Sequence, residues 1–75
     1  MNKNDRAQVA KVIGMLEEAK SILEDLSSAE RDKFDNMSEG LQSSERGQSI
    51  EQAADALEEA FGNVEEAISN LENIE

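Results

Sequence analysis

The sequence predicts an all-α fold: an antiparallel helical hairpin with a long N-terminal helix, a short middle helix and a long C-terminal helix, dimerising into a bundle. Two stretches repeat apolar residues at alternating intervals of three and four, which is the heptad pattern of helices that pack along one side. The chain has no Pro, and 33% of its residues are charged, which fits uninterrupted helices with solvated outer sides. All 75 residues are expected to form a single helical domain, because a chain of this length builds only one core.

The first helix is predicted over residues 5–26. Asp5 is a suitable N-cap, because its side chain can accept a hydrogen bond from a free backbone N–H of the first turn. The apolar residues that follow form one column at heptad spacing: Val9, Val12, Leu16, Ala19, Leu23 and Leu26. We expect this column to pack on the C-terminal helix.

A short second helix is predicted over residues 28–37, followed by a loop over residues 38–43. Ser27 and Glu30 have the spacing of a capping box, in which the two side chains satisfy each other's backbone N–H groups. The heptad column also stops there, because its next positions would be Glu30 and Lys33. Gly40 is expected to end this region in a left-handed conformation.

The longest helix is predicted over residues 44–74, with Ser43 or Ser44 as its N-cap. Its heptad column has no interruption: Ile50, Ala53, Leu57, Ala60, Val64, Ala67, Leu71 and Ile74. Gly62 lowers helix propensity by roughly 1 kcal/mol relative to Ala. Because the column continues in phase on both sides of Gly62, we expect the helix to run through it.

A second apolar column, formed by Ala54, Phe61 and Ile68, flanks the first one and makes the apolar stripe wider than one partner helix requires. A chain of this size buries only about 60% of the surface that it exposes when unfolded, so a single copy is expected to be marginally stable. The sequence therefore predicts a homodimer. We expect Ile13 or Ile22 to contribute to its interface, together with four residues of the last helix: Leu57, Phe61, Val64 and Ile68.

The formal net charge is −11, and residues 44–75 hold one basic residue against nine acidic ones. This charge repels nucleic acid and anionic membranes, and it favours a basic protein as partner. The acidic face of the last helix comprises Glu51, Asp55, Glu58, Glu59, Glu65 and Glu66. An alternative role for these carboxylates is to mimic the DNA backbone, although a seven-residue helical repeat of about 10.5 Å is longer than the spacing of about 3.4 Å between phosphates of one strand.

The residue types that most enzymes use are missing, since the chain has no His, Cys or Tyr. No Gly-rich phosphate-binding loop and no pattern of metal ligands is present. We therefore expect no catalytic activity, no cofactor and no metal site. The first residues contain no apolar leader, and no stretch is apolar enough to cross a membrane, which predicts a cytoplasmic protein.

The turn over residues 34–47 does not follow the heptad pattern and mixes large apolar residues with amides, Arg46 and two glycines. Turns held by rigid helices often carry recognition sites. The candidate partner-binding residues are Phe34, Asn36, Met37, Leu41, Gln42 and Arg46. The segments Phe34-Asp35-Asn36-Met37, Glu39-Gly40-Leu41-Gln42 and Ser44-Glu45-Arg46-Gly47, followed by an acidic Ala-rich heptad helix, resemble a group of small helical proteins of bacteriophages and prophages.

This resemblance implies a phage or prophage context, in the cytoplasm of a bacterial host. Together with the charge pattern, it leads us to expect a non-enzymatic protein-binding module that regulates or inhibits a host or defence component. Two other classes remain open. One is a structural or assembly protein whose heptads meet another coiled coil, and the other is an anti-defence protein that mimics DNA or sequesters a small anion with Arg31, Lys33 and Arg46.

Overall fold

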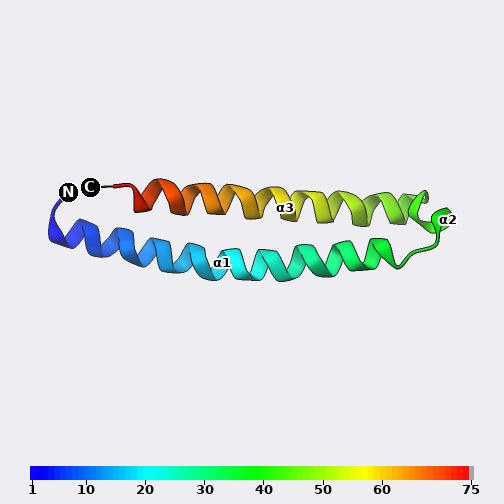
Figure 1. Cartoon of the computed structure of the whole chain (residues 1–75), viewed down its shortest axis with the longest axis horizontal. Coiled ribbons are helices and arrows are strands. Elements are labelled where there is room, and N and C mark those ends of the chain that lie inside the picture. Colours follow the sequence, from blue (N-terminus) through cyan, green and yellow to red (C-terminus); the bar gives the residue numbers. More distant parts are fainter. Residues whose placement is uncertain (75) are drawn as a thin grey trace.

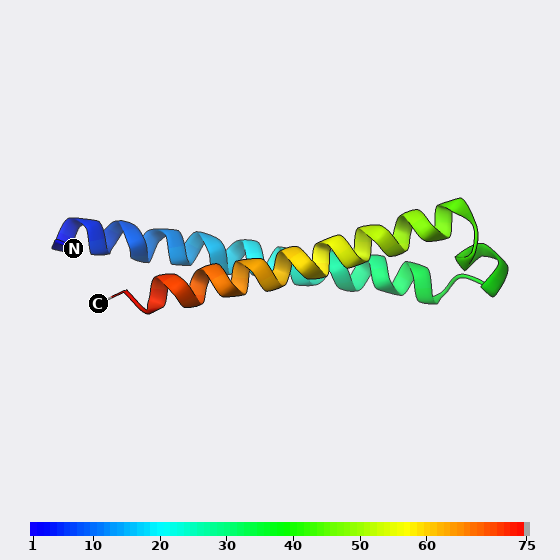
Figure 2. The ribbon, with the colours of Figure 1, turned by 90° about the horizontal axis from the view of Figure 1, so that it is seen from above.

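The computed structural model describes residues 1–74 and shows an antiparallel helical hairpin with no β-strand in that range (Figure 1). Helix α1 spans Lys3–Asp35, the short helix α2 spans Glu39–Gln42, and helix α3 spans Glu45–Glu72. The hairpin is 58 Å long and 14 Å wide and thick, and its two termini lie at the same end. Seen from above, α1 and α3 cross near their middles at a shallow inclination (Figure 2). The predicted all-α hairpin of one long, one short and one long helix is confirmed.

Helix α1 is longer than predicted, and the expected break at Ser27 is wrong. The Ser27 hydroxyl donates a hydrogen bond to the backbone carbonyl of Glu24, at 3.0 Å, so it is bonded within the helix and does not act as a cap. The side chain is buried against the rest of the hairpin, and this packing favours a continuous helix. The segments predicted as helices 5–26 and 28–37 are therefore one element. Its N-cap is Asn2, whose Oδ1 atom accepts a hydrogen bond from the Asp5 N–H at 2.7 Å, in place of the predicted Asp5.

The region predicted as a loop over residues 38–43 contains α2. Ser38 caps this single turn, because its Oγ atom accepts a hydrogen bond from the Leu41 N–H at 3.4 Å. Gly40 lies inside α2, and none of the four glycines has a positive φ angle. The expected left-handed ending at Gly40 is therefore wrong, and α1 ends with Asn36 in right-handed geometry as its C-cap.

Helix α3 agrees closely with its prediction. Ser44 is the N-cap, and its Oγ atom accepts a hydrogen bond from the Gly47 N–H at 3.2 Å. The helix continues through Gly62, as the unbroken apolar column predicts. It ends at Glu72, two residues earlier than expected, with Asn73 as C-cap. A glutamate in the last turn opposes the helix dipole, which accounts for the earlier end.

The interface between α1 and α3 uses a different pair of columns from the predicted one. Val9, Leu16 and Leu23 of α1 are half-buried in the interface, as expected. The other half of the predicted column, Val12, Ala19 and Leu26, is replaced there by Ile13, Lys20, Ser27 and Phe34. On α3 the interface is formed by Gly47, Ile50, Ala54, Leu57, Phe61, Val64, Ile68 and Leu71. Choosing Phe61 and Ile68 over Ala60 and Ala67 buries more apolar surface, and burial of apolar surface is the main favourable term in helix packing.

Within a single chain, this choice already covers part of the predicted dimer interface. Ile68 is only 5% exposed and Ala54 is fully buried, so α1 of the same chain already covers that column. Leu57, Phe61 and Val64 are half-buried in the same hairpin interface. A second copy is therefore not needed to cover the Ala54, Phe61 and Ile68 column. Within residues 1–74, no helix has a run of residues long and apolar enough to span a bilayer.

Candidate interaction surfaces

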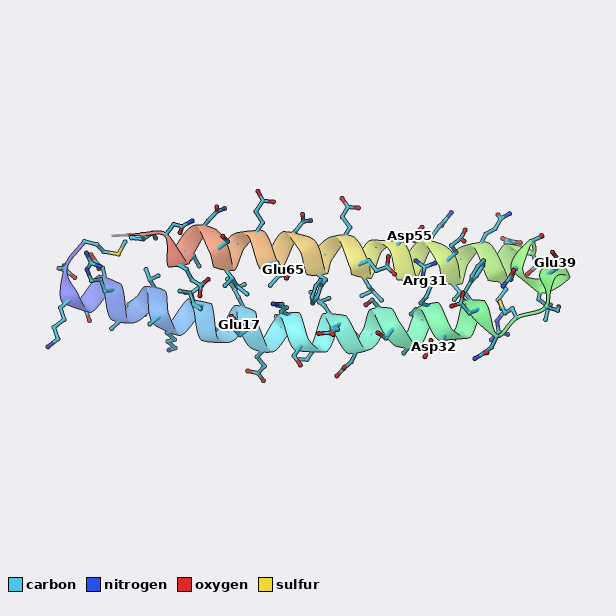
Figure 3. All side chains as sticks on the ribbon, in the orientation of Figure 1. Glu17, Arg31, Asp32, Glu39, Asp55 and Glu65 are labelled. Carbon is cyan, nitrogen blue, oxygen red and sulfur yellow. The ribbon has the colours of Figure 1, made fainter. Side chains whose placement is uncertain are left out.

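A cluster of three charged side chains, Arg31, Asp55 and Glu58, ties α1 to α3 along one edge of the hairpin interface. Figure 3 labels Arg31 and Asp55. The Arg31 Nη2 atom donates hydrogen bonds to Asp55 Oδ1 at 2.7 Å and to Glu58 Oε1 at 3.1 Å, and Nε donates to the same Glu58 oxygen at 3.2 Å. The hydrogen bond to Asp55 first, and that to Glu58 second, raise the pKa of Arg31 above its ordinary value. The guanidinium group is therefore engaged by the protein's own carboxylates.

Two lysines are paired as well. Lys20 Nζ lies 3.5 Å from Glu65 Oε2 and 5.6 Å from the centroid of the Phe61 ring, within the range of a cation–π contact. Lys33 Nζ lies 2.7 Å from Glu30 Oε1. An anion-sequestering role was expected to use Arg31, Lys33 and Arg46. Because two of these three cations already have carboxylate partners, the arrangement does not favour that role.

These pairs divide the acidic face into two parts. Asp55, Glu58 and Glu65 lie at the edge of the interface and reach cations of α1. Glu59 and Glu66 are exposed, and neither makes an ion pair with any side chain of residues 1–74. Glu51 is half-buried. The part of the acidic face that is available to a partner is therefore centred on Glu59 and Glu66.

The turn uses several of its predicted recognition residues to hold itself together. Gln42 Nε2 donates a hydrogen bond to the Phe34 carbonyl at 3.0 Å, which joins α2 to the last turn of α1. Phe34 and Met37 are half-buried. Gly47 is buried beneath α2, and a Cβ atom there would lie 2.6 Å from the Gln42 carbonyl oxygen and closer still to that of Leu41. The predicted residues that remain exposed are Asn36, Leu41 and Arg46.

One side of the hairpin carries an exposed apolar surface, which we call the apolar face. On α1 its larger side chains are Val12, Met15, Ile22 and Leu26, which are 44%, 62%, 54% and 47% exposed. Together with two alanines, these side chains form two heptad columns that are apolar throughout: Val12, Ala19 and Leu26, and Met15, Ile22 and Ala29. On α3 the column Ala53, Ala60, Ala67 and Ile74 is half-buried or exposed.

Helix geometry places these two sets of residues on the same side of the hairpin. Successive residues are 100° apart around a helix axis. Ala60 directly precedes Phe61 and Glu58 directly follows Leu57, so Ala60 and Glu58 flank opposite edges of the interface. Val12, Ala19 and Leu26 likewise precede interface positions of α1. In two antiparallel helices, the residues that directly precede the interface positions lie along the same edge of the interface. Ala60 of α3 and Val12 of α1 therefore border one edge, and the apolar face lies opposite the edge where Arg31 binds Glu58.

The uncharged character of this side extends beyond the alanine column of α3. The next heptad position outward is also free of acids: Ser49, Ala56, Asn63 and Asn70. At the opposite edge, the position equivalent to the alanine column is glutamate four times in succession: Glu51, Glu58, Glu65 and Glu72. The sequence signal for this surface was therefore present, but the columns of Val12 and Ala53 were predicted to lie inside the hairpin, and of the Met15 column only Ile22 was predicted for a dimer interface.

An open hollow between the start of α1 and the end of α3 is lined mainly by apolar side chains, together with Arg6 and Glu72. Among residues 1–74, no group of three or more Asp or Glu side chains is arranged to hold a metal ion. Protein-family models, curated proteins and solved structures were compared with this chain, and none of them matches it.

Proposed function

We propose that this chain is a non-enzymatic protein-binding module that docks its acidic face on a basic surface of another protein. The observation that carries the proposal is the exposure of Glu59 and Glu66 on a helix that packs along α1 over its whole length. A rigid helix presents these carboxylates with little loss of conformational entropy on binding. Charge complementarity of this kind speeds association and excludes acidic partners.

The resemblance of the turn to small phage and prophage proteins supports a more specific form of this proposal. In that form, the module acts in the cytoplasm of a bacterial host and regulates or inhibits a host or defence component. Asn36, Leu41 and Arg46 are exposed at the end of the hairpin and would extend the contact beyond the acidic face. The contacts of Phe34, Met37 and Gln42 within the turn support a structural role for these three residues.

A DNA-mimicking role receives less support from the geometry. Asp55 and Glu58 share the Arg31 guanidinium, so the row of carboxylates is interrupted by a positive charge. A mimic of the phosphate backbone needs a regular series of unneutralised negative charges. Competition by duplex DNA for the captured partner would distinguish this role from general binding to a basic protein.

The test is affinity capture from a bacterial lysate by the immobilised chain at low salt, with the bound proteins identified by mass spectrometry. The double variant Glu59→Gln/Glu66→Gln should retain a captured basic partner at least ~10-fold less well than wild type, because rim charges govern such association. The matched control Glu18→Gln/Asp25→Asn removes two exposed charges from α1 and should bind as wild type does. Equal capture by all three chains would exclude the acidic face as the contact surface. Loss of capture only in Leu41→Ala or Arg46→Ala would assign contact to the turn instead.

A further inference from the structure

The proposed function uses Glu59 and Glu66 of α3 and the exposed residues of the turn, so it leaves the apolar face unused. We propose that a second copy of this chain covers the apolar face, so that two hairpins form a four-helix bundle. This homodimer goes beyond the proposed function and does not depend on it.

A single hairpin buries too few apolar side chains to form a substantial core. Among residues 1–74, Ala54 and Ile68 are the only apolar side chains that the hairpin buries, and Ile22 and Leu26 remain about half exposed. Two helices alone cannot surround a core, and bundles of four helices bury such columns between facing pairs. Covering the apolar face would turn half-buried residues such as Leu16 and Leu57 into core residues.

The side of the hairpin that carries the apolar face is comparable in area to one partner's share of a stable interface. A hairpin 58 Å long and 14 Å wide presents a projected area on the order of 800 Å² on one side, which is the area that each partner contributes to a standard stable interface. The larger exposed apolar side chains of α1 occupy the middle of this length, from Val12 to Leu26, which is about 21 Å at 1.5 Å per residue. Contact over the whole side therefore reaches the size of a standard interface, with these apolar side chains at its centre and polar residues around them.

The distribution of charge favours a second copy as the occupant. Two chains of net charge −11 repel each other through any acidic surface, and like charges brought face to face are unfavourable. The apolar face avoids this repulsion. On α1, the columns of Val12 and Met15 carry no acid between residues 12 and 29, and on α3 the columns of Ala53 and Ser49 carry none between residues 49 and 74. Two copies paired through this face direct the four glutamates of each α3 edge away from the shared interface.

Side-chain size indicates how the two copies pair. The face has large residues on α1 and mainly alanines on α3, so α1 of one copy packs best over α3 of the other. A two-fold axis parallel to the hairpin produces this arrangement and leaves both turns at the same end. Large side chains such as Ile22 then pack against small ones such as Ala60, which allows close approach of the helices.

The test is the mass of the purified chain by size exclusion with light scattering, over a range of concentrations. Wild type should have twice the 8.2 kDa mass of one chain. Ile22→Glu and Ala60→Glu should each weaken the dimer by at least ~100-fold, because each places two unpaired carboxylates in the interface. Neither position is buried in a single hairpin, so helicity by circular dichroism should persist at concentrations where the hairpin is monomeric.

The matched control is Ala7→Glu, the same substitution at an exposed site off the apolar face, and it should remain dimeric. If the variants lose helicity, wild type still tests the proposal, because the midpoint of thermal unfolding of a dimer rises with concentration. A wild-type mass of 8.2 kDa at ~100 µM, or an oligomer unaffected by Ile22→Glu and Ala60→Glu, would overturn it. The variant Glu59→Gln/Glu66→Gln should keep the dimer mass, so failure of the proposed function and failure of this inference are distinguishable.

Discussion

Arg31 of α1 donates two hydrogen bonds to a single oxygen of Glu58 on α3, at 3.1 and 3.2 Å, across 27 residues of chain. This pair lies at the edge of the interface opposite the apolar face, in the register that burial of Phe61 and Ile68 selects. A guanidinium is suited to this pairing, because its planar donors require a defined geometry that a lysine ammonium does not.

Replacing Arg31 by Lys should lower the midpoint of thermal unfolding, because one ammonium cannot reproduce the paired hydrogen bonds to Asp55 and Glu58. The loss should be smaller at high salt, which screens exposed ion pairs. Thermal unfolding at two salt concentrations, followed by circular dichroism, checks both statements. An equal loss at both salt concentrations would point to packing of the side chain as the cause.

The pH dependence of the Arg31 contribution follows from the direction of its pKa shift. The folded-state pKa is raised above the unfolded value, so the stabilisation is fully present below the unfolded pKa and is lost only as the pH rises through the folded pKa. Both lie far above neutrality. The difference in unfolding free energy between wild type and Arg31→Met should therefore stay constant from about pH 6 to about pH 9, as denaturant titrations at several pH values would show.

Gly47 and Gly62 should respond in opposite ways to substitution by Ala. A Cβ atom at Gly47 would lie 2.6 Å from the Gln42 carbonyl oxygen, whereas one at Gly62 meets nothing within 4 Å. Gly47→Ala should lower the free energy of unfolding by about 2 kcal/mol, because α2 has to move. Gly62→Ala should raise it by about 1 kcal/mol through helix propensity alone. Denaturant unfolding of both variants provides the comparison, and a stabilising Gly47→Ala would show that the turn adapts freely.

Ser27→Ala should be neutral or stabilising by about 0.5 kcal/mol, because alanine has the higher helix propensity and the hydroxyl bonds only to Glu24 of its own helix. If Ser27 instead capped a new helix, the same change would destabilise the protein by about 1 kcal/mol. The exposed neighbour Ser28 is the control, since Ser28→Ala changes propensity without removing a buried hydroxyl. Urea unfolding of the two variants decides between a continuous and a broken helix.

Gln42→Ala should destabilise the hairpin by about 1 kcal/mol, because it removes the part-buried hydrogen bond to the Phe34 carbonyl. The control is Gln48→Ala, whose side-chain bond to the Ser43 carbonyl is exposed and longer, at 3.4 Å, and whose loss should be close to neutral. The free energies of unfolding are compared in urea. Stability unchanged by Gln42→Ala would leave this residue available for the recognition role that its position in the turn first indicated.

The local pattern of residues was sufficient to predict much of the fold. The unbroken heptad column of residues 50–74 predicted that the helix continues through Gly62, and the observed cap, Ser44, is one of the two serines predicted for that position. Most of the acidic face could also be found in advance from the charge pattern, but the sequence could not separate the exposed turn residues Asn36, Leu41 and Arg46 from Phe34, Met37 and Gln42, which are half-buried. By contrast, Ser27 with Glu30 satisfies a capping pattern locally, and only its burial in the hairpin favours continuation of α1.

The sequence by itself determined that two long amphipathic helices pair as a hairpin, since heptad spacing and length are properties of each segment alone. The tertiary structure decided which apolar columns face each other. Each helix offers two overlapping columns, and the choice depends on contacts between segments distant in sequence: burial of Ile68 under α1, and the pairs of Lys20 with Glu65 and Arg31 with Glu58. Those contacts exist only after the chain has folded back on itself, so periodicity could identify the columns without assigning them to the inside or the outside of the hairpin.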